Sequence, residues 1–216
     1  MNKFDPSKIS EEKFDVRSLR KLDRVFYLRD VRAVAKDLLG KLFVKQNGDN
    51  LLAGRIVEVE AYRGEDDEAA HSYGGKTNRN SVMFEEGGLL YVYLIYGIHF
   101  CANVVTEKKN VGDAVLIRAL EPVAGADEMF KNRFPGKNIS DKTFLNLTNG
   151  PAKLCQAFGI ERSENGVDLT NGGIFIAEKK ETKKIKIVKT TRVGISKSKD
   201  LPWRFYIKEN PFVSVK

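Results

Sequence analysis

The sequence predicts a single mixed α+β domain, in which strands and helices follow one another irregularly. Its 216 residues fit one domain better than two, and they can bury a sizeable core without disulfides or metals. No internal repeat and no linker rich in proline or serine divides the chain. The regular strand–helix–strand rhythm of a parallel sheet is missing too. We expect residues 1–20 to form a loosely ordered leader and residues 21–216 to form the domain.

The first elements of the domain are a helix and two strands. Residues 30–40 place apolar side chains at helical spacing behind Asp30, whose carboxylate can cap the first turn. Residues 41–45 then alternate as a strand does. The sequence Asn-Gly-Asp-Asn over 47–50 predicts a turn, and a second strand follows over 54–62.

A long loop and two β-prone runs come next. Residues 63–88 show no apolar periodicity and include four consecutive acidic residues; a loop of this length is usually functional or disordered. Residues 89–96 and 98–106 are rich in aromatic and β-branched side chains, which favour strands. Because Tyr96-Gly97 lies between the two runs, we expect a tight hairpin or a bend there.

The rest of the chain predicts further strands and helices. A proline near the first position and a glycine at the end bound one of these helices. In chain order, the predicted elements are a strand over 111–120 that ends at Glu121-Pro122, a helix over 126–134, a helix from Pro151 to Gly159, strands within 172–195 and a last strand over 203–208.

The composition is that of an ordinary globular protein. A hydrophobic fraction of 42% and a charged fraction of 31% exclude a long disordered chain, a collagen-like repeat and a disulfide miniprotein. The longest apolar stretch, residues 89–105, is interrupted by Gly97, His99 and Asn103, so we predict no membrane helix. Residues 1–20 are polar and carry both charge signs, which predicts no signal peptide, and the two cysteines fit a reducing compartment.

The charge distribution is uneven. The net charge of +8 suggests a polyanionic partner, usually nucleic acid or an anionic membrane, although a basic protein without such a partner is the alternative. Residues 51–100 nevertheless sum to −4, whereas residues 151–216 sum to +7. An enzyme that needs a carboxylate beside a polyanion would use such an acidic patch. Residues 178–199 hold nine basic and two acidic residues, which fits either a phosphate-binding stripe or a strand edge protected by lysines.

Strand alternation gathers polar side chains on one face of the second predicted strand. Glu58, Glu60 and Tyr62 share that face, which is either solvated or lines a cleft. Arg118 lies among apolar neighbours in a later strand. A half-buried arginine needs a carboxylate partner, and we expect this partner to be Glu60.

Aromatic and amide side chains in the β-prone runs have two interpretations each. Tyr91 and Tyr93 share a strand face, which usually belongs to the core, although tyrosines also stack on bases. Tyr96 either joins a core row of its strand or is exposed at a hairpin tip, where it could enter a duplex. Asn103 either satisfies backbone groups or contacts a ligand edge. His71 follows the acidic loop, and a lone histidine is more often structural than catalytic.

Motifs for metals, phosphates and nucleophiles are missing from the sequence. His99 and Cys101 point to one strand face, but no second pair completes a tetrahedral zinc site. No glycine-rich phosphate loop and no Gly-x-Ser-x-Gly nucleophile motif occurs. We therefore expect no metal and no cofactor.

A series of short segments stands in an order that is far more specific than any single motif. The segments are Val59-Glu60-Ala61-Tyr62, Asp67 to Ser72, Arg79-Asn80, Met83-Phe84, Leu90 to Tyr93, Ile95-Tyr96-Gly97, Phe100-Cys101, Asn103, Leu116 to Pro122, Asn149 to Ala157, Arg192-Val193-Gly194 and Pro202 to Ile207. In this arrangement the chain resembles the alkyladenine (3-methyladenine) DNA glycosylase family, and the resemblance covers roughly residues 22–214.

The resemblance implies one mixed domain around a curved antiparallel sheet with surrounding helices. It implies a monofunctional glycosylase that flips a damaged purine out of duplex DNA and hydrolyses its glycosidic bond, which starts base excision repair. By this resemblance, Glu60 is the general base that activates water, and Arg118 and the backbone carbonyl of Val193 help to hold that water. Tyr96 is the wedge that fills the vacated position in the duplex.

The resemblance also implies the residues that bind the flipped base. Tyr62, His71 and Tyr93 are the walls that stack on it, and the backbone around Ala69 and His71 forms hydrogen bonds with its edge. Asn103 obstructs the exocyclic amine of guanine.

Other functions account for fewer of these sequence features. A non-catalytic nucleic-acid binder would use the basic surface and the tyrosines, but it has no use for Glu60 beside an arginine. A nucleotide hydrolase needs a phosphate loop or a metal cluster, and a lyase needs a site lysine. We expect a monomer that acts on double-stranded DNA with damaged purines, without metal or membrane, in a bacterial cytoplasm or a eukaryotic nucleus. 3-Methyladenine, 7-methylguanine, hypoxanthine and ethenoadenine all remain compatible substrates.

Overall fold

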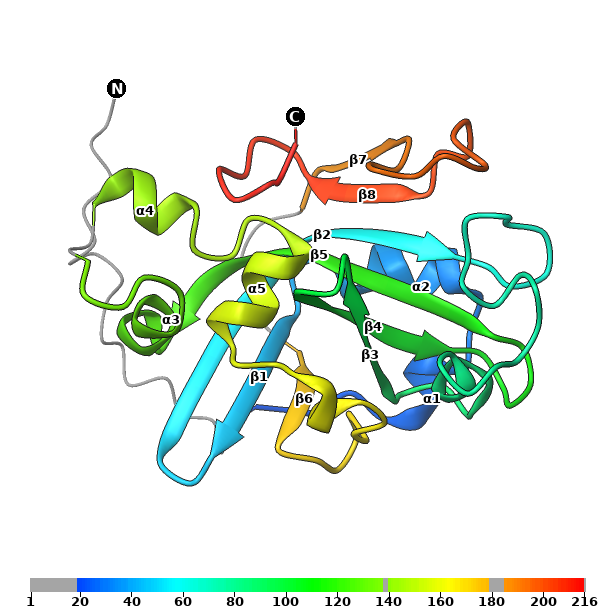
Figure 1. The fold of residues 1–216 in the computed structure, drawn as a ribbon, viewed down its shortest axis with the longest axis horizontal. Helices are drawn as coiled ribbons and strands as arrows, with labels where there is room; N and C mark the ends of the chain where they lie inside the picture. The colour runs from blue at the N-terminus through cyan, green and yellow to red at the C-terminus, as the bar shows by residue number, and fades with distance from the viewer. Residues whose placement is uncertain (1–18, 138–139, 179–184, 216) are drawn as a thin grey trace.

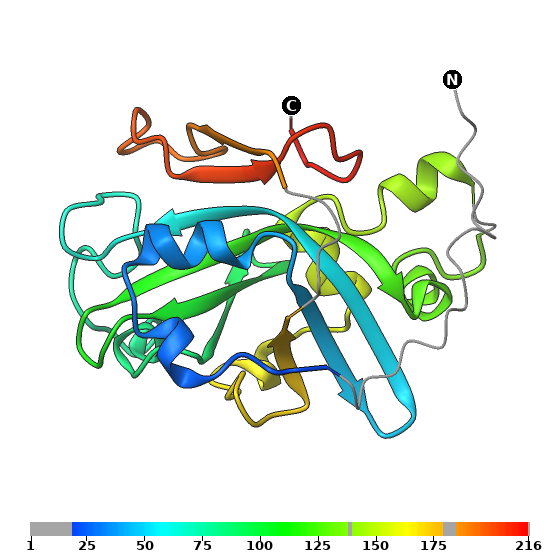
Figure 2. The same ribbon diagram turned by 180° about the vertical axis from the view of Figure 1, so that it is seen from behind.

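The structure, a computed structural model, describes residues 19–137, 140–178 and 185–215. In this part of the chain, eight strands form one curled antiparallel sheet with helices on both faces (Figures 1 and 2). The predicted α+β class is therefore confirmed. The leader predicted over residues 1–20 falls almost wholly outside the described residues.

The elements follow the predicted order, with some changes in their bounds. The strands are β1 (Leu42–Asn47), β2 (Asn50–Tyr62), β3 (Leu90–Ile95), β4 (His99–Thr106), β5 (Asp113–Ala124), β6 (Ile174–Ala177), β7 (Ile187–Thr190) and β8 (Arg204–Ile207). The helices are α1 (Arg24–Tyr27), α2 (Val31–Leu38), α3 (Ala126–Arg133), α4 (Asp141–Leu145) and α5 (Pro151–Ala157), with 3₁₀ helices η3 (Ser81–Phe84) and η4 (Arg162–Glu164).

The predicted end of one strand at Glu121-Pro122 is wrong, because β5 continues to Ala124. Beyond Leu116, β5 has β2 as its one strand partner in the described part of the chain. This portion of β5 is therefore a sheet edge, where proline is tolerated.

Strand β2 is the centre of the sheet. Its first half pairs with β1 and its second half pairs with β8, while β5 runs along its other side. In Figure 1, β8 lies above the second half of β2, and β7 lies next to β8. The β2 side chains from Ile56 to Ala61 are fully buried.

The pairing of β2 with β5 shifts register twice around Glu58, and these shifts set the direction of one β5 side chain. Glu58 pairs with Ala119, whereas the next residue, Val59, pairs with Ile117, so Arg118 is an extra residue on β5. Val57 is the compensating extra residue on β2. Bulges of this kind redirect side chains and are common beside active sites. Here the bulge turns Arg118 toward the carboxylates of β2.

The hairpin predicted at Tyr96-Gly97 is confirmed. Strands β3 and β4 pair from Ile95 with His99, and the Ile98 N–H donates to the Ile95 carbonyl at 3.3 Å. Both turn residues have positive φ, 53° at Tyr96 and 72° at Gly97. A positive φ is ordinary for glycine, but for a bulky tyrosine it is a strained conformation.

The helices cover the sheet from both sides. Helix α2 packs on β2 behind the sheet, and Asp30 caps it as predicted, accepting from the N–H groups of Arg32 and Ala33 (Figure 2). Helix α5 packs on β4 and β5 at the front, and it begins at Pro151 as expected (Figure 1). No helix in the described ranges is both long enough and apolar enough to cross a membrane.

Candidate active site

A cavity of about 340 Å³ opens beside the β3–β4 hairpin. Side chains from β2, the long loop after it, the hairpin, β5 and the segment between β7 and β8 line this cavity. The lining residues are Tyr62, Ala69, His71, Met83, Tyr91, Tyr93, Ile95, Tyr96, Cys101, Asn103, Ala114, Leu116, Arg118, Pro151, Val193, Gly194 and Ile195. They include every predicted site residue except Glu60, which lies directly behind the wall.

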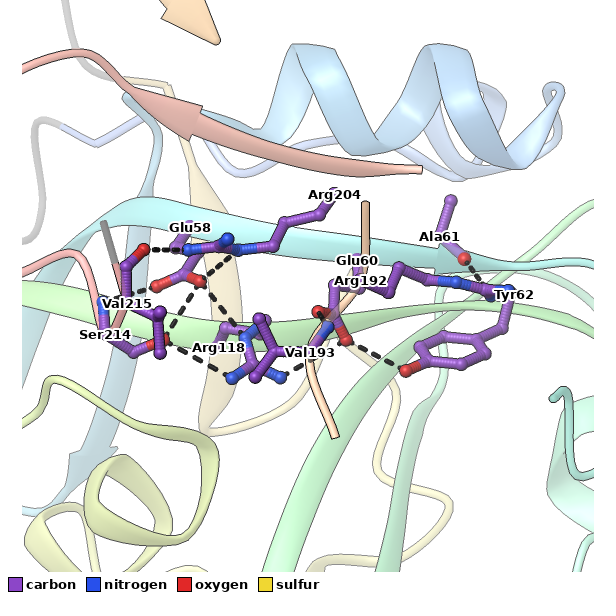
Figure 3. Close-up of polar contacts among 10 residues, drawn as sticks. All are labelled: Glu58, Glu60, Ala61, Tyr62, Arg118, Arg192, Val193, Arg204, Ser214 and Val215. Atoms are coloured by element: carbon purple, nitrogen blue, oxygen red, sulfur yellow. Dashed lines mark hydrogen bonds and ion pairs between the residues drawn. The ribbon is translucent and has the colours of Figure 1, made fainter. Parts of the chain in front are cut away.

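The Glu60 carboxylate is fully buried and receives three donors (Figure 3). The Tyr62 hydroxyl donates to Oε2 at 2.8 Å, the Val193 N–H donates to Oε1 at 2.8 Å, and Arg118 Nη1 lies 3.2 Å from Oε2. All three donors belong to residues that line the cavity. An ionised carboxylate has about four acceptor positions, so one stays open beside the donors from the described residues.

Val193 makes a contact that the sequence resemblance did not imply. The resemblance implied that the Val193 carbonyl helps to hold the attacking water, whereas in the structure the Val193 N–H donates to Glu60. The position of Val193 in the site is as expected, and a role for its carbonyl stays a prediction. Burial, followed by the nearby Glu60 charge, raises the pKa of Tyr62 above its usual value. The phenol therefore stays protonated and donates a hydrogen bond to Glu60.

Arg118 makes the predicted ion pair with Glu60 and adds a second one. Its Nε lies 3.1 Å from Glu58 Oε1. Burial opposes the positive charge, yet Glu60 and Glu58 together raise the pKa of Arg118 above its usual value. Glu58 is fully buried as well, so the polar face of β2 is not solvated.

Aromatic side chains form one wall of the cavity. The rings of Tyr91 and Tyr93 stack with centroids 5.5 Å apart, and the His71 ring stands edge-on to Tyr93 at 4.5 Å. Burial, then the charge of Arg79, lowers the pKa of His71, and burial raises the pKa of both tyrosines. Burial also raises the pKa of the Cys101 thiol to about 11. These groups are all uncharged at neutral pH.

Tyr91 is a wall residue that the sequence analysis did not assign to the site. Its hydroxyl lies 3.2 Å from His71 Nδ1, so it fixes the orientation of the imidazole. The signal was present, because alternation placed Tyr91 on the same strand face as Tyr93.

Asn103 serves the backbone and the cavity together. Its Nδ2 donates to the carbonyl of Tyr91, its paired residue on the neighbouring strand, at 3.2 Å, and its side chain also lines the cavity. Tyr96 lies at the cavity edge with 84% of its surface exposed. The alternative of a core position for Tyr96 is therefore wrong.

A buried ion pair holds the segment that carries Val193. Arg192 Nη2 lies 2.7 Å from Asp67 Oδ1, and Nη1 bonds the carbonyl of Ala61 at 3.0 Å. The Arg192 guanidinium also covers the Tyr62 ring at 4.5 Å (Figure 3). The pair joins the acidic loop to the Glu60 donors, a role that the sequence analysis did not foresee, because the two residues are 125 positions apart.

The basic stripe over 178–199 keeps both of its interpretations. Residues 179–184 lie outside the described residues, and buried Arg192 is not available to phosphate. The remaining exposed members are Lys186, Lys189, Lys197 and Lys199. Strand β7 pairs with β8 alone among the described strands, so it forms a sheet edge. The described residues contain no cluster of three or more histidine, cysteine, aspartate or glutamate side chains suited to a metal ion.

Comparison with known proteins gives a consistent picture over the length of the chain. The family model described as methylpurine-DNA glycosylase (MPG) matches residues 25–211. A protein of Clostridium novyi (strain NT) is 50% identical over 205 residues, which cover 92% of this chain and 100% of that protein. A protein of Desulfitobacterium hafniense (strain Y51) is 46% identical over 204 residues, with the same two coverages. Both bear the name "Putative 3-methyladenine DNA glycosylase".

Proposed function

Because the chain belongs to the methylpurine-DNA glycosylase family, hydrolases that act on alkylated purines, we propose that it flips a damaged purine from duplex DNA and hydrolyses its glycosidic bond with a water activated by Glu60. The observation that carries this proposal is the buried Glu60 carboxylate, held by three donors that line the cavity. A protein that only binds DNA has no use for a buried carboxylate beside its binding pocket, because the phosphates of DNA are also negatively charged.

The cavity supports the binding of a single base. Its volume of about 340 Å³ lies at the small end of the range for ligand pockets, roughly 300–1,000 Å³. Tyr62, His71 and Tyr93 present uncharged rings to it. Purines alkylated on a ring nitrogen carry positive charge, and aromatic faces attract cations. The backbone N–H of His71 donates to no described residue, so it is available to form a hydrogen bond with the edge of the base.

The chemical step follows from the position of Glu60. The bond between the purine nitrogen and the sugar C1′ breaks, and its electron pair leaves with the base. The water oxygen bonds C1′, and a water proton passes to Glu60. The carboxylate also stabilises the positive charge that develops on the sugar. An alkylated cationic purine leaves as a neutral base, so the step needs no strong acid for the leaving group.

Two residues adapt the site to its substrate. Exposed Tyr96, held in a strained conformation at the hairpin tip, fills the gap that the flipped nucleotide leaves. Asn103, fixed by its bond to the Tyr91 carbonyl, occupies the space that the exocyclic amine of guanine would need. Flipping itself costs least for damaged or weakly paired bases, which adds selectivity.

The direct test is release of free base from methylated duplex DNA, followed by chromatography. We expect free 3-methyladenine or 7-methylguanine and an abasic strand. Tight binding to the methylated duplex without release would overturn the proposal and support a non-catalytic binder. A panel with hypoxanthine and ethenoadenine duplexes then defines the damage range.

A further inference from the structure

Glu58 is a buried carboxylate that the proposed reaction does not use. It accepts from Arg204 Nε at 2.7 Å, from Arg118 Nε at 3.1 Å, and from the Ser214 N–H and hydroxyl at 2.6 and 3.0 Å (Figure 3). Glu58 and Ser214 do not line the cavity. An effect of Glu58 on the reaction must therefore pass through a residue that lines the cavity, and Arg118 is the one residue of this set that does so.

The Arg118 guanidinium is fixed on three sides. Nε bonds Glu58, Nη2 bonds the Ser214 hydroxyl at 3.3 Å, and Nη1 points to Glu60. A guanidinium group is rigid and planar, so holding Nε and Nη2 sets the direction of Nη1. The position of the Arg118 charge relative to Glu60 thus depends on Glu58 and Ser214.

The charges of the cluster also balance. Glu58 and Glu60 are two buried anions, and Arg118 and Arg204 are two buried cations. Without Glu58, Glu60 would be the single carboxylate beside two cations. The surplus positive charge would stabilise the ionised form of Glu60 and make it a weaker proton acceptor.

The chain segment that carries Ser214 is firmly docked. Phe212 and Val213 are buried, and Phe212 packs edge-on against Phe144 with ring centroids 5.7 Å apart. Arg204 also donates to the carbonyl of Val215. Residues 212–215 are therefore a fixed support behind Arg118.

We infer that Glu58 is a positioning residue for the glycosylase reaction: with Ser214 it orients Arg118 and offsets its charge, so that Glu60 keeps its strength as a base. This inference rests on the proposed function. It gives the last described residues of the chain a positioning role in the reaction, although they lie behind the cavity wall.

The test compares Glu58→Gln, Ser214→Ala and Ser214→Thr with Glu121→Gln as the matched control. Glu121 also pairs with an arginine on this sheet and accepts from Asn210 near the C-terminus, but it does not contact Arg118. Single-turnover excision of a methylated duplex is measured across pH, together with lesion-DNA affinity and melting temperature.

We expect Glu58→Gln to slow excision by about 10- to 100-fold, with affinity within about twofold of wild type. The acid limb of its pH–rate profile moves to lower pH, because Glu60 stays ionised more readily. Ser214→Ala gives a smaller loss, which Ser214→Thr restores because it keeps the hydroxyl. Glu121→Gln excises at the wild-type rate with an unchanged profile.

An unchanged rate and pH profile in folded Glu58→Gln would overturn the inference. If that variant fails to fold, the serine pair decides, and equal rates for Ser214→Ala and Ser214→Thr overturn the inference. A loss in Glu121→Gln as large as in Glu58→Gln would show loosening of the fold instead. A wild-type protein that releases no base refutes the proposed function, whereas an active wild type with active variants refutes this inference alone.

Discussion

Replacing Tyr96 tests whether its side chain inserts into DNA or supports the fold. Truncating a buried aromatic costs about 3–5 kcal/mol, which in a protein of this size lowers the melting temperature by about 6–20 °C. Tyr96 is 84% exposed and stands at a turn with nothing to bury it, so Tyr96→Ser should lower the melting temperature by less than about 2 °C.

Tyr96→Gly sharpens the same prediction through its sign. The left-handed φ of 53° costs a tyrosine about 1–2 kcal/mol, which glycine does not incur. The greater freedom of glycine in the unfolded chain offsets about 0.5–1 kcal/mol of that gain. We therefore expect Tyr96→Gly to be as stable as wild type or more stable, by up to about 1.5 kcal/mol.

Excision should fall in both variants, because the extruded state loses the ring that stacks in the gap. Stacking of one aromatic on a base contributes about 1–3 kcal/mol, which corresponds to about a 5- to 150-fold loss. Thermal melting and single-turnover excision on the same samples measure both effects, and Val25→Ser, also exposed at 71%, is the control. A large drop in melting temperature with intact excision per folded molecule would refute the assignment.

Two further predictions concern the cavity wall and a buried acid. Asn103→Ser should raise excision of normal guanine relative to hypoxanthine, because the smaller side chain leaves room for the exocyclic amine; an unchanged ratio would mean that Asn103 only supports the Tyr91 carbonyl. Burial raises the pKa of Asp113 to about 6, so wild-type stability should decline as pH rises from about 4 to 7, by up to about 3 kcal/mol. Asp113→Asn, which can still accept from the Gly64 N–H, should remove that decline in urea unfolding at pH 5 and pH 8, and a parallel decline in the variant would contradict this explanation.

The sequence predicted the long elements well because they carry periodic apolar patterns and clear boundary residues. Asp30 caps α2 as expected, and the aromatic hairpin forms where Tyr96-Gly97 predicted a turn. Helices α1 and α4, of four and five residues, were not predicted, since such short helices show no periodicity and depend on tertiary packing.

The candidate site residues were predicted from strand alternation and from the family resemblance, and neither of these shows contacts between residues far apart in the sequence. Alternation placed Glu58 beside Glu60 but could not show that both are buried. Their burial depends on Arg204 and Ser214, which lie 146 and 156 positions from Glu58. The role of the Val193 N–H was missed for a related reason, because a side-chain pattern does not show which backbone group faces a carboxylate.

The central claim is that Glu60 accepts a proton from the attacking water. Glu60→Gln nearly preserves the shape of the side chain but removes the base, so single-turnover excision of a methylated duplex should fall by at least about 100-fold. Binding to the same duplex should survive, since Tyr62, His71 and Tyr93, which are expected to stack on the base, are unchanged in the variant. Measuring both quantities on a variant with a wild-type circular dichroism spectrum decides the matter. Loss of excision with retained affinity is the predicted result, and near-normal excision by Glu60→Gln would contradict the account.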